Sequence, residues 1–241
     1  MPVTRVEKSF HVETHKVSRG ALFRNIILGT QDGVVNVLGI VLGVATATNS
    51  SYLVLLAGLA ATFAESLSMA AVAYTSSRAE AEHYKAELHR ELDEMEQVPE
   101  KEREEIEQIF REKGFSGKLL KQVVNTICSD RKVWLKTMMR DELGLEDPTK
   151  GMSSFQQGVL VGVSSFIGSL IPITAFFFLP VAVATPIGLL ASLIVLFGVG
   201  AYKSKLMSGK WLWGGLELMI IGGTAALAGY LIGDLFKVPN P

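Results

Sequence analysis

Hydrophobic residues fill 49% of the 241 positions and the mean hydropathy is +0.32, yet charged residues still reach 20%. The charge must therefore be kept apart from the apolar segments, which is typical of a membrane protein with a polar part. The net charge of −1 gives no sign of nucleic-acid binding, and the single cysteine, Cys128, excludes an internal disulfide framework and a thiolate metal site.

Five apolar stretches are long enough to cross a bilayer, which takes roughly 20 mostly apolar residues per helix. They are Ala21–Thr48, Tyr52–Tyr74, Phe155–Leu179, Val181–Tyr202 and Trp211–Phe236. Barrel strands would be shorter and would alternate, so we expect an all-α polytopic membrane protein with five transmembrane helices. The expected parts are an N-terminal tail (1–19), transmembrane helices 1 and 2 (20–76), a helical metal-binding insertion (77–150) and transmembrane helices 3 to 5 (151–241).

Basic residues in the short connections predict the orientation in the membrane. The N-terminal tail, the insertion and the connection that holds Lys203, Lys205 and Lys210 carry basic residues, whereas 47–51 and 179–186 carry no charge. We therefore expect the N-terminus and the insertion in the cytosol and the C-terminus outside. An odd number of spans without an internal repeat argues against an inverted-repeat transporter within one chain, which favours a pathway at a homodimer interface.

Two acidic residues lie inside the first two spans, where a charge at mid-bilayer costs at least about 2.5–3.5 kcal/mol. Asp32 has Asn36 one helical turn later on the same face, and Glu65 has Met69 placed in the same way. Each acid thus has a second ligand group beside it, which predicts a cation pathway. The alternative is that both acids are protonated, or hydrogen-bonded to neighbouring helices, and only fix the packing.

Two further features of the spans concern packing. Gly39 and Gly43 in the first span have the four-residue spacing that allows close contact between helices. Glu217 follows Trp211 and Trp213 at the start of the last span, where its side chain can reach the interface, so we assign it no role.

The insertion is predicted to consist of helices separated by breaks. The stretch 76–97 has no Gly or Pro, so the second span is expected to continue to its end without interruption. Pro99 then begins a second helix (99–114), because proline is favoured in the first turn. A third unit (117–144) is expected to break at Ser129–Asp130.

Most of the 24 acidic residues lie in the insertion, and four of them form two Glu-x-x-Glu pairs. Glu91 and Glu94 lie on its first helix, and Glu102 and Glu105 lie on its second. Like charges at this spacing destabilise a helix by about 0.2–0.5 kcal/mol per pair, and both pairs border apolar stripes. The four carboxylates are therefore aimed at a neighbouring helix rather than at open water.

The third helix of the insertion offers Met138, Met139 and Glu142 close to one face. If the helices fold as a three-helix hairpin, this turn and the two glutamate pairs converge on one metal cluster. Carboxylate oxygens suit hard or borderline divalent ions and thioether sulfur suits softer ones, so the set favours a transition metal over Ca²⁺ or Mg²⁺. The alternative is a solvated acidic face with Met138 or Met139 in the core.

The histidines add no further site. Glu80 and His83 match half of a di-iron Glu-x-x-His pattern, but the ferritin-like scheme needs two copies, so we expect neither oxidase chemistry nor any other enzyme activity. His11 and His15 lie in the N-terminal tail, where two histidines are more often incidental than ligands.

With these residues the chain resembles the vacuolar iron transporter family, over about 20–236. Four features carry the resemblance: Asp32–Gly33 with the Gly/Val-rich span that follows, Ser68–Met69–Ala70, the long helical insertion, and 140–144 with the sequence Arg-Asp-Glu-Leu-Gly. The family consists of five-span dimers that exchange ferrous or other divalent metal for protons.

The resemblance implies roles for particular residues. It implies that the insertion collects metal through Glu91, Glu94, Glu102, Glu105, Met138 and Glu142, with Met139 as a companion. It also implies that Asp32 and Met69 lie on the intramembrane pathway, where Glu65 shares the face of Met69.

The expected function is transport of Fe²⁺ out of the cytosol in exchange for protons, by a homodimer embedded in membrane lipid. Mn²⁺, Co²⁺ and Zn²⁺ suit the same ligands. No sorting signal is recognisable, so the expected location is the cell membrane in a prokaryote and the vacuolar membrane in a eukaryote.

Two other functions stay open. The insertion would serve equally as a metal sensor that gates a passive channel, which flux against a metal gradient would exclude. Alternatively, the chain is a membrane interaction protein whose acidic helices dock a basic partner, in which case the insertion would bind no metal.

Overall fold

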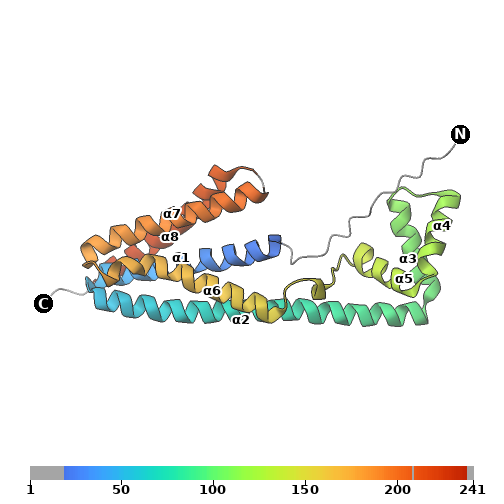
Figure 1. Ribbon diagram of the computed structural model, residues 1–241, viewed down its shortest axis with the longest axis horizontal. Helices are drawn as coiled ribbons and strands as arrows, with labels where there is room; N and C mark the ends of the chain where they lie inside the picture. The colour runs from blue at the N-terminus through green and yellow to red at the C-terminus, as the bar shows by residue number, and fades with distance from the viewer. Residues whose placement is uncertain (1–18, 208, 238–241) are drawn as a thin grey trace. The chain divides into compact units, whose positions relative to one another are not determined.

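The computed structural model describes residues 19–207 and 209–237, and the regular structure in these ranges is entirely helical (Figure 1). The all-α fold class is therefore confirmed for the described residues. Apart from Arg19, the predicted N-terminal tail, with His11 and His15, lies outside them. The α-helices are α1 (Arg19–Thr48), α2 (Ser51–Gln97), α3 (Pro99–Glu112), α4 (Gly117–Cys128), α5 (Arg131–Thr137), α6 (Ser154–Ile173), α7 (Val181–Met207) and α8 (Trp211–Leu235).

The chain divides into two compact units, each described here by itself. The membrane unit consists of the described residues within 1–74 and 155–241, and the insertion unit is Thr75–Ser154. Helix α2 contributes its first half to the membrane unit and its second half to the insertion unit.

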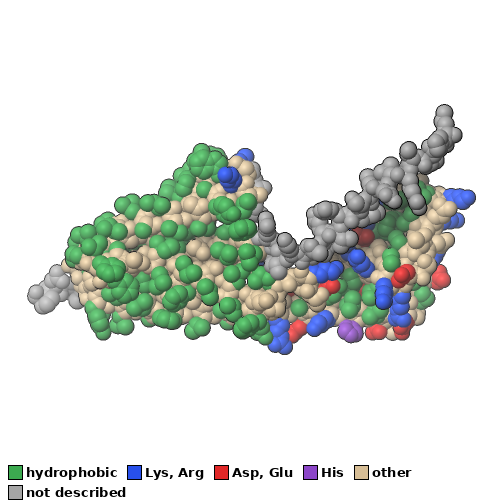
Figure 2. Space-filling model, viewed as in Figure 1, with side chains coloured by type: hydrophobic (Ala, Val, Ile, Leu, Met, Phe, Trp, Pro, Cys, Tyr) green, Lys and Arg blue, Asp and Glu red, His purple; other side chains and the backbone are tan. Residues whose placement is uncertain are grey.

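Five helices are long and apolar enough to cross a membrane: α1, α2, α6 with its continuation, α7 and α8. By length and composition they agree with the five predicted spans, whereas α3, α4 and α5 belong to the insertion unit. The visible surface of the membrane unit is mostly hydrophobic (Figure 2). The third span differs in detail from its prediction, because α6 ends at Ile173, one residue after Pro172, and continues as the short 3₁₀-helix η3 (Thr174–Phe177).

Helix α1 contacts α7 and α8, which also pack against each other. The predicted close contact at Gly39 and Gly43 is confirmed, and the partner is α8. A Cβ atom on Gly229 would meet the carbonyl oxygen of Gly39, and one on Gly233 would meet that of Gly43. Only glycine allows the two backbones to come this close.

The turn between α1 and α2 is short. Asn49 has φ of 48°, the left-handed conformation that Asn tolerates at a helix end, and its N–H donates to the Ala45 carbonyl at 3.1 Å. The Ser50 hydroxyl then accepts from the N–H of Leu53 at 3.5 Å, at the start of α2. The two spans are therefore consecutive and run in opposite directions.

The insertion unit follows the predicted breaks. Helix α2 continues without interruption to Gln97, and Pro99 begins α3. Helix α4 ends before Ser129–Asp130, where the Asp130 carboxylate accepts hydrogen bonds from two N–H groups of α5, at 2.8 and 3.3 Å. Helix α3 contacts α4, and α4 contacts α5. The small apolar core between them is formed by Ile106, Leu120, Val124, Ile127 and Met138.

Candidate metal sites

The two intramembrane acids lie side by side. Asp32 and Glu65 are almost equally far along the chain from the turn at Asn49, so antiparallel packing of α1 and α2 brings them to the same depth. The Glu65 carboxyl is within hydrogen-bonding reach of both the Asp32 carboxyl and the Asn36 amide. Met69, one turn further along α2, is half-buried.

This polar cluster lies next to surface that a single chain leaves open. Asn36 is exposed; on the same side of α1, Leu28, two turns before it, and Ile40, one turn after it, are 47% and 42% exposed. On α2, Phe63 and Leu67, which flank Glu65, are 57% and 71% exposed. Polar and ionisable groups inside a membrane normally face protein or a water-filled path rather than lipid.

Helix α6 adds two hydroxyl groups that the sequence analysis missed. Ser165 and Ser169 are fully buried, and their Oγ atoms have no hydrogen-bond partner among the described residues. Both lie against Gly33, the residue after Asp32. By contrast, the hydroxyls of Thr62 and Ser66 on α2 donate to carbonyls of their own helix at 2.8 and 2.6 Å. Glycine and serine recur along this side of α6, a signal that resembles ordinary helix packing.

In the insertion unit, Glu91 and Glu94 of α2 meet Glu102 of α3. One carboxylate oxygen from each of the three residues lies within 4.8 Å of the others. Because α3 follows the break at Val98, Glu102 of the second predicted Glu-x-x-Glu pair comes close to both members of the first pair, whereas Glu105 is not part of this group. A divalent ion at the centre of such a triangle can be reached by all three carboxylates.

Two of these carboxylates are buried without enough hydrogen bonds. Glu91 is 1% exposed and Glu102 is 0% exposed. The Oε2 atom of Glu91 and both carboxylate oxygens of Glu102 have no partner among the described residues. A buried, unpartnered carboxylate is costly unless it takes up a proton or a cation. A solvated acidic face would not bury these groups.

Burial and mutual repulsion raise the proton affinity of the cluster. Burial, then the charge of Glu105, raises the pKa of Glu102 to about 7. Partial burial of its carboxyl, then the charges of Glu105 and Glu91, likewise raises the pKa of Glu142 to about 7, although much of its side chain is exposed. Burial also raises the pKa of Glu91. Glu105 and Glu142 thus belong electrostatically to the same cluster.

Basic side chains border the cluster, and the sequence analysis did not assign them a place. The Arg90 guanidinium lies 3.0 Å from Glu87, 3.4 Å from Glu91 and 3.8 Å from Glu94. The Lys101 ammonium lies 3.3 Å from Glu105. Their i,i+1 to i,i+4 spacing to the acids was the available signal, although such pairs are common on exposed helices.

The methionines occupy a different position from the carboxylates. Met138 and Met139 are 0% and 2% exposed, and Met138 packs in the apolar core with Ile106. The turn that holds them, η1 (Met138–Glu142), is a π-helix rather than the continuation of an α-helix, and its N–H to carbonyl bond runs from Leu143 to Met138 at 3.2 Å. Residues four or five apart share a face of a π-turn, so Glu142 still lies close to the face of Met138. Helix α3 contacts η1.

Comparison with known proteins decides the family. A sequence model described as the VIT family matches residues 23–234. The chain belongs to the VIT family. It is 31% identical to a protein named vacuolar iron transporter from Centaurea cyanus, over 90% of this chain and 88% of the relative.

Other VIT family relatives are similarly distant. The chain is 32% identical to vacuolar iron transporter 2 of Oryza sativa subsp. japonica, over 91% of this chain and 89% of the relative. It is 30% identical to the vacuolar iron transporter of Plasmodium berghei, over 94% of this chain and 86% of the relative. These relatives are named transporters rather than enzymes. Together with the five apolar helices, they identify an integral membrane protein.

The raised pKa values in this VIT family chain predict how metal affinity depends on pH. Glu102 and Glu142, with pKa values of about 7, hold protons in part at neutral pH. A protonated carboxyl does not bind metal, so divalent metal should bind more weakly as pH falls from about 8 to about 6, and binding at pH 7 should release protons. Calorimetric titration of the full chain with Mn²⁺, in two buffers of different ionisation enthalpy, measures both effects. An affinity that is constant over this range would contradict the assignment.

The buried Glu102 carboxylate predicts a gain in stability when it is removed. Glu102→Met should stabilise the metal-free insertion unit by about 1–3 kcal/mol, because an apolar side chain replaces an unpartnered buried carboxyl. Metal should no longer stabilise this variant. Trp134 fluorescence follows unfolding in a background with Trp211→Phe and Trp213→Phe. Glu104→Met, on the exposed side of α3, is the matched control and should change the stability by less than about 0.5 kcal/mol. Equal effects of the two substitutions would rule out a special role for the buried site.

Proposed function

We propose that this chain transports divalent iron out of the cytosol in exchange for protons. The observation that carries the proposal is the pairing of Asp32 with Glu65 between two membrane-spanning helices, in a family whose relatives are named for iron transport. A carboxyl pair at this position can hold either a proton or a metal ion.

The insertion is proposed to capture the metal. Glu91, Glu94 and Glu102 supply the central ligands, because their oxygens converge and two of the side chains are buried. Glu105 and Glu142 are proposed as outer ligands, since both act electrostatically on the central group. Met138 and Met139 complete the set if η1 rearranges to turn a thioether out of the core.

The intramembrane pair is proposed to couple the two ions. Two carboxyl groups that share a hydrogen bond need one proton between them, whereas a divalent ion bound by both needs neither to be protonated. Binding of metal to Asp32 and Glu65 therefore expels a proton, and protonation from the far side releases the metal. Asn36 and Met69 are proposed as neutral ligands beside the pair.

A homodimer is proposed because the polar cluster adjoins open surface. Asn36 and the exposed apolar side chains around Glu65 would be covered if a second copy packed on this face, and the pathway would then run along the interface. The proposed orientation is the one that the basic connections predict, with the N-terminus and the insertion in the cytosol. The membrane is proposed to be the cell membrane in a prokaryote and the vacuolar membrane in a eukaryote.

The ligand set accepts more than one metal. Carboxylates with thioethers suit Fe²⁺, and Mn²⁺, Co²⁺ and Zn²⁺ are expected to compete in the order set mainly by the ion itself. Competition between these ions for uptake measures the preference.

Accumulation of Fe²⁺ in proteoliposomes tests the proposal. With an acidic interior and neutral exterior, the vesicles should accumulate iron above its outside concentration, and a protonophore should abolish the accumulation. Iron flux that only equilibrates would support the gated channel instead. Absence of both flux and metal binding would support the interaction protein.

A further inference from the structure

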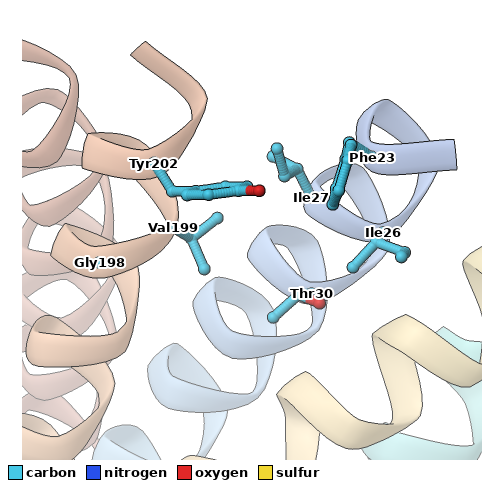
Figure 3. A pocket seen from close by; sticks show the side chains of 7 residues that line it. All are labelled: Phe23, Ile26, Ile27, Thr30, Gly198, Val199 and Tyr202. Carbon is cyan, nitrogen blue, oxygen red and sulfur yellow. The ribbon is translucent and has the colours of Figure 1, made fainter. Parts of the chain in front are cut away.

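An apolar pocket opens between α1 and α7 of the membrane unit. Its volume is about 300 Å³. Figure 3 shows its walls: side chains from the N-terminal part of α1 face side chains from the C-terminal part of α7. The lining residues are Phe23, Ile26, Ile27, Thr30, Gly198, Val199 and Tyr202.

The pocket continues the core of the membrane unit where the two helices diverge. Deeper in the unit, Val34 of α1 packs with Leu196 of α7, with Val199 against them. Toward the helix ends the gap is bridged by Phe23 and Tyr202, whose rings meet edge to face at 5.8 Å between centroids. The pocket is open to the outside and is not an enclosed void, and its volume exceeds the about 150 Å³ that admits a small hydrocarbon. The space is therefore suited to an apolar ligand.

Basic side chains continue the pocket wall at one end. Lys203 follows Val199 by four residues and Lys205 follows Tyr202 by three, so the two lysines flank the pocket face of α7 on either side, one turn further along the helix. Arg24, next to Phe23, is exposed at the corresponding end of α1. Figure 2 shows basic side chains at this end of the α7–α8 pair, on a surface that is otherwise mostly hydrophobic. The apolar pocket suits an acyl chain, and the basic side chains beside it suit an anionic head group.

A second copy of the chain is not suited to this pocket if it covers the polar cluster. On the helical wheel of α1, Phe23, Ile27 and Thr30 lie opposite Asp32 and Asn36. A partner packed over the acids therefore leaves the pocket open to the bilayer.

We propose that the pocket binds one anionic phospholipid, with an acyl chain between α1 and α7 and the head group on Lys203, Lys205 and Arg24. The proposal does not depend on the transport function. It requires only that the five apolar helices lie in a membrane.

Gly198 allows the pocket to be filled without disturbing the fold. A Cβ atom added at Gly198 would meet no atom within 4 Å, so Gly198→Leu places its side chain in the pocket. Gly223 of α8 also has nothing within 4 Å and does not line the pocket, which makes Gly223→Leu the matched control. Lys203→Gln with Lys205→Gln removes two positive charges that would bind the head group and leaves the apolar lining of the pocket unchanged.

Native mass spectrometry of the full chain tests the site, after reconstitution with equal amounts of phosphatidylglycerol and phosphatidylcholine and extraction into mild detergent. Wild type and Gly223→Leu should retain one phosphatidylglycerol per chain, and Gly198→Leu should lose it. The double lysine variant should lose its preference for phosphatidylglycerol by roughly fivefold for each lysine.

Three results would overturn the proposal. The first is equal lipid retention by Gly198→Leu and Gly223→Leu. The second is equal retention of the two lipids by wild type, which would show that the pocket does not select an anionic head group. The third is a dimer that Gly198→Leu alone disrupts while lipid retention stays unchanged, which would make a second copy the occupant.

Discussion

Asp32→Asn should reduce iron flux in proteoliposomes by roughly 100-fold or more, because the loss of one negative charge within about 4 Å of a divalent ion removes several kcal/mol of attraction even in a partly solvated site. The amide keeps the size of the side chain and its hydrogen bonding to Glu65, so the fold should be preserved. Metal binding by the insertion should be unchanged. Uptake of radioactive iron, with calorimetric titration of the same preparation, measures both quantities.

Glu217→Gln provides the control for Asp32→Asn. Glu217 is also an acid in a membrane-spanning helix, but it is exposed on α8 and has no place in the proposed pathway. Its neutralisation should leave the flux within about twofold of wild type, since no ligand charge is lost. If both variants transport iron equally, Asp32 is not on the path.

The second large effect is expected in the insertion. Glu91→Gln with Glu102→Gln should weaken metal binding at least about 100-fold, because the two buried carboxylates supply most of the charge at the centre of the triangle. Transport should slow at low metal concentration and recover at high concentration, since capture is lost while Asp32 and Glu65 remain. Titration with Mn²⁺ and the metal dependence of uptake test these two parts.

The matched control changes the same number of charges on exposed positions. Glu100→Gln with Glu104→Gln lies on the solvent side of α3 and should leave the affinity within about threefold of wild type. A similar loss in both double variants would mean that the insertion attracts metal only through its general negative charge.

Much of the fold follows from local signals in the sequence. Hydropathy identifies the five spans, and the absence of Gly and Pro between 76 and 97 predicts the continuous helix α2. Pro99 and the Asp130 cap mark helix starts, because both act within one turn of the chain. The π-turn η1 was not predictable, because no local propensity in Met138–Glu142 distinguishes it from an α-helix.

The candidate sites depend on contacts between helices and were only partly predictable. The spacing within each glutamate pair indicates that its two side chains point the same way. The complete burial of Glu102 depends on how the helices pack, and a charged residue is normally expected to be exposed. The almost equal distances of Asp32 and Glu65 from the turn at Asn49 were the signal for their pairing, which the sequence analysis did not use. The roles of all these residues stay predictions.

Proton movement driven by metal tests the central claim most directly. Proteoliposomes containing the wild-type chain and a pH-sensitive dye, with an acidic interior, receive Fe²⁺ outside under anaerobic conditions. The proposed exchange predicts that the interior becomes more alkaline as iron enters, and that Asp32→Asn abolishes both changes. Iron entry at the wild-type rate without any change in internal pH would contradict proton exchange.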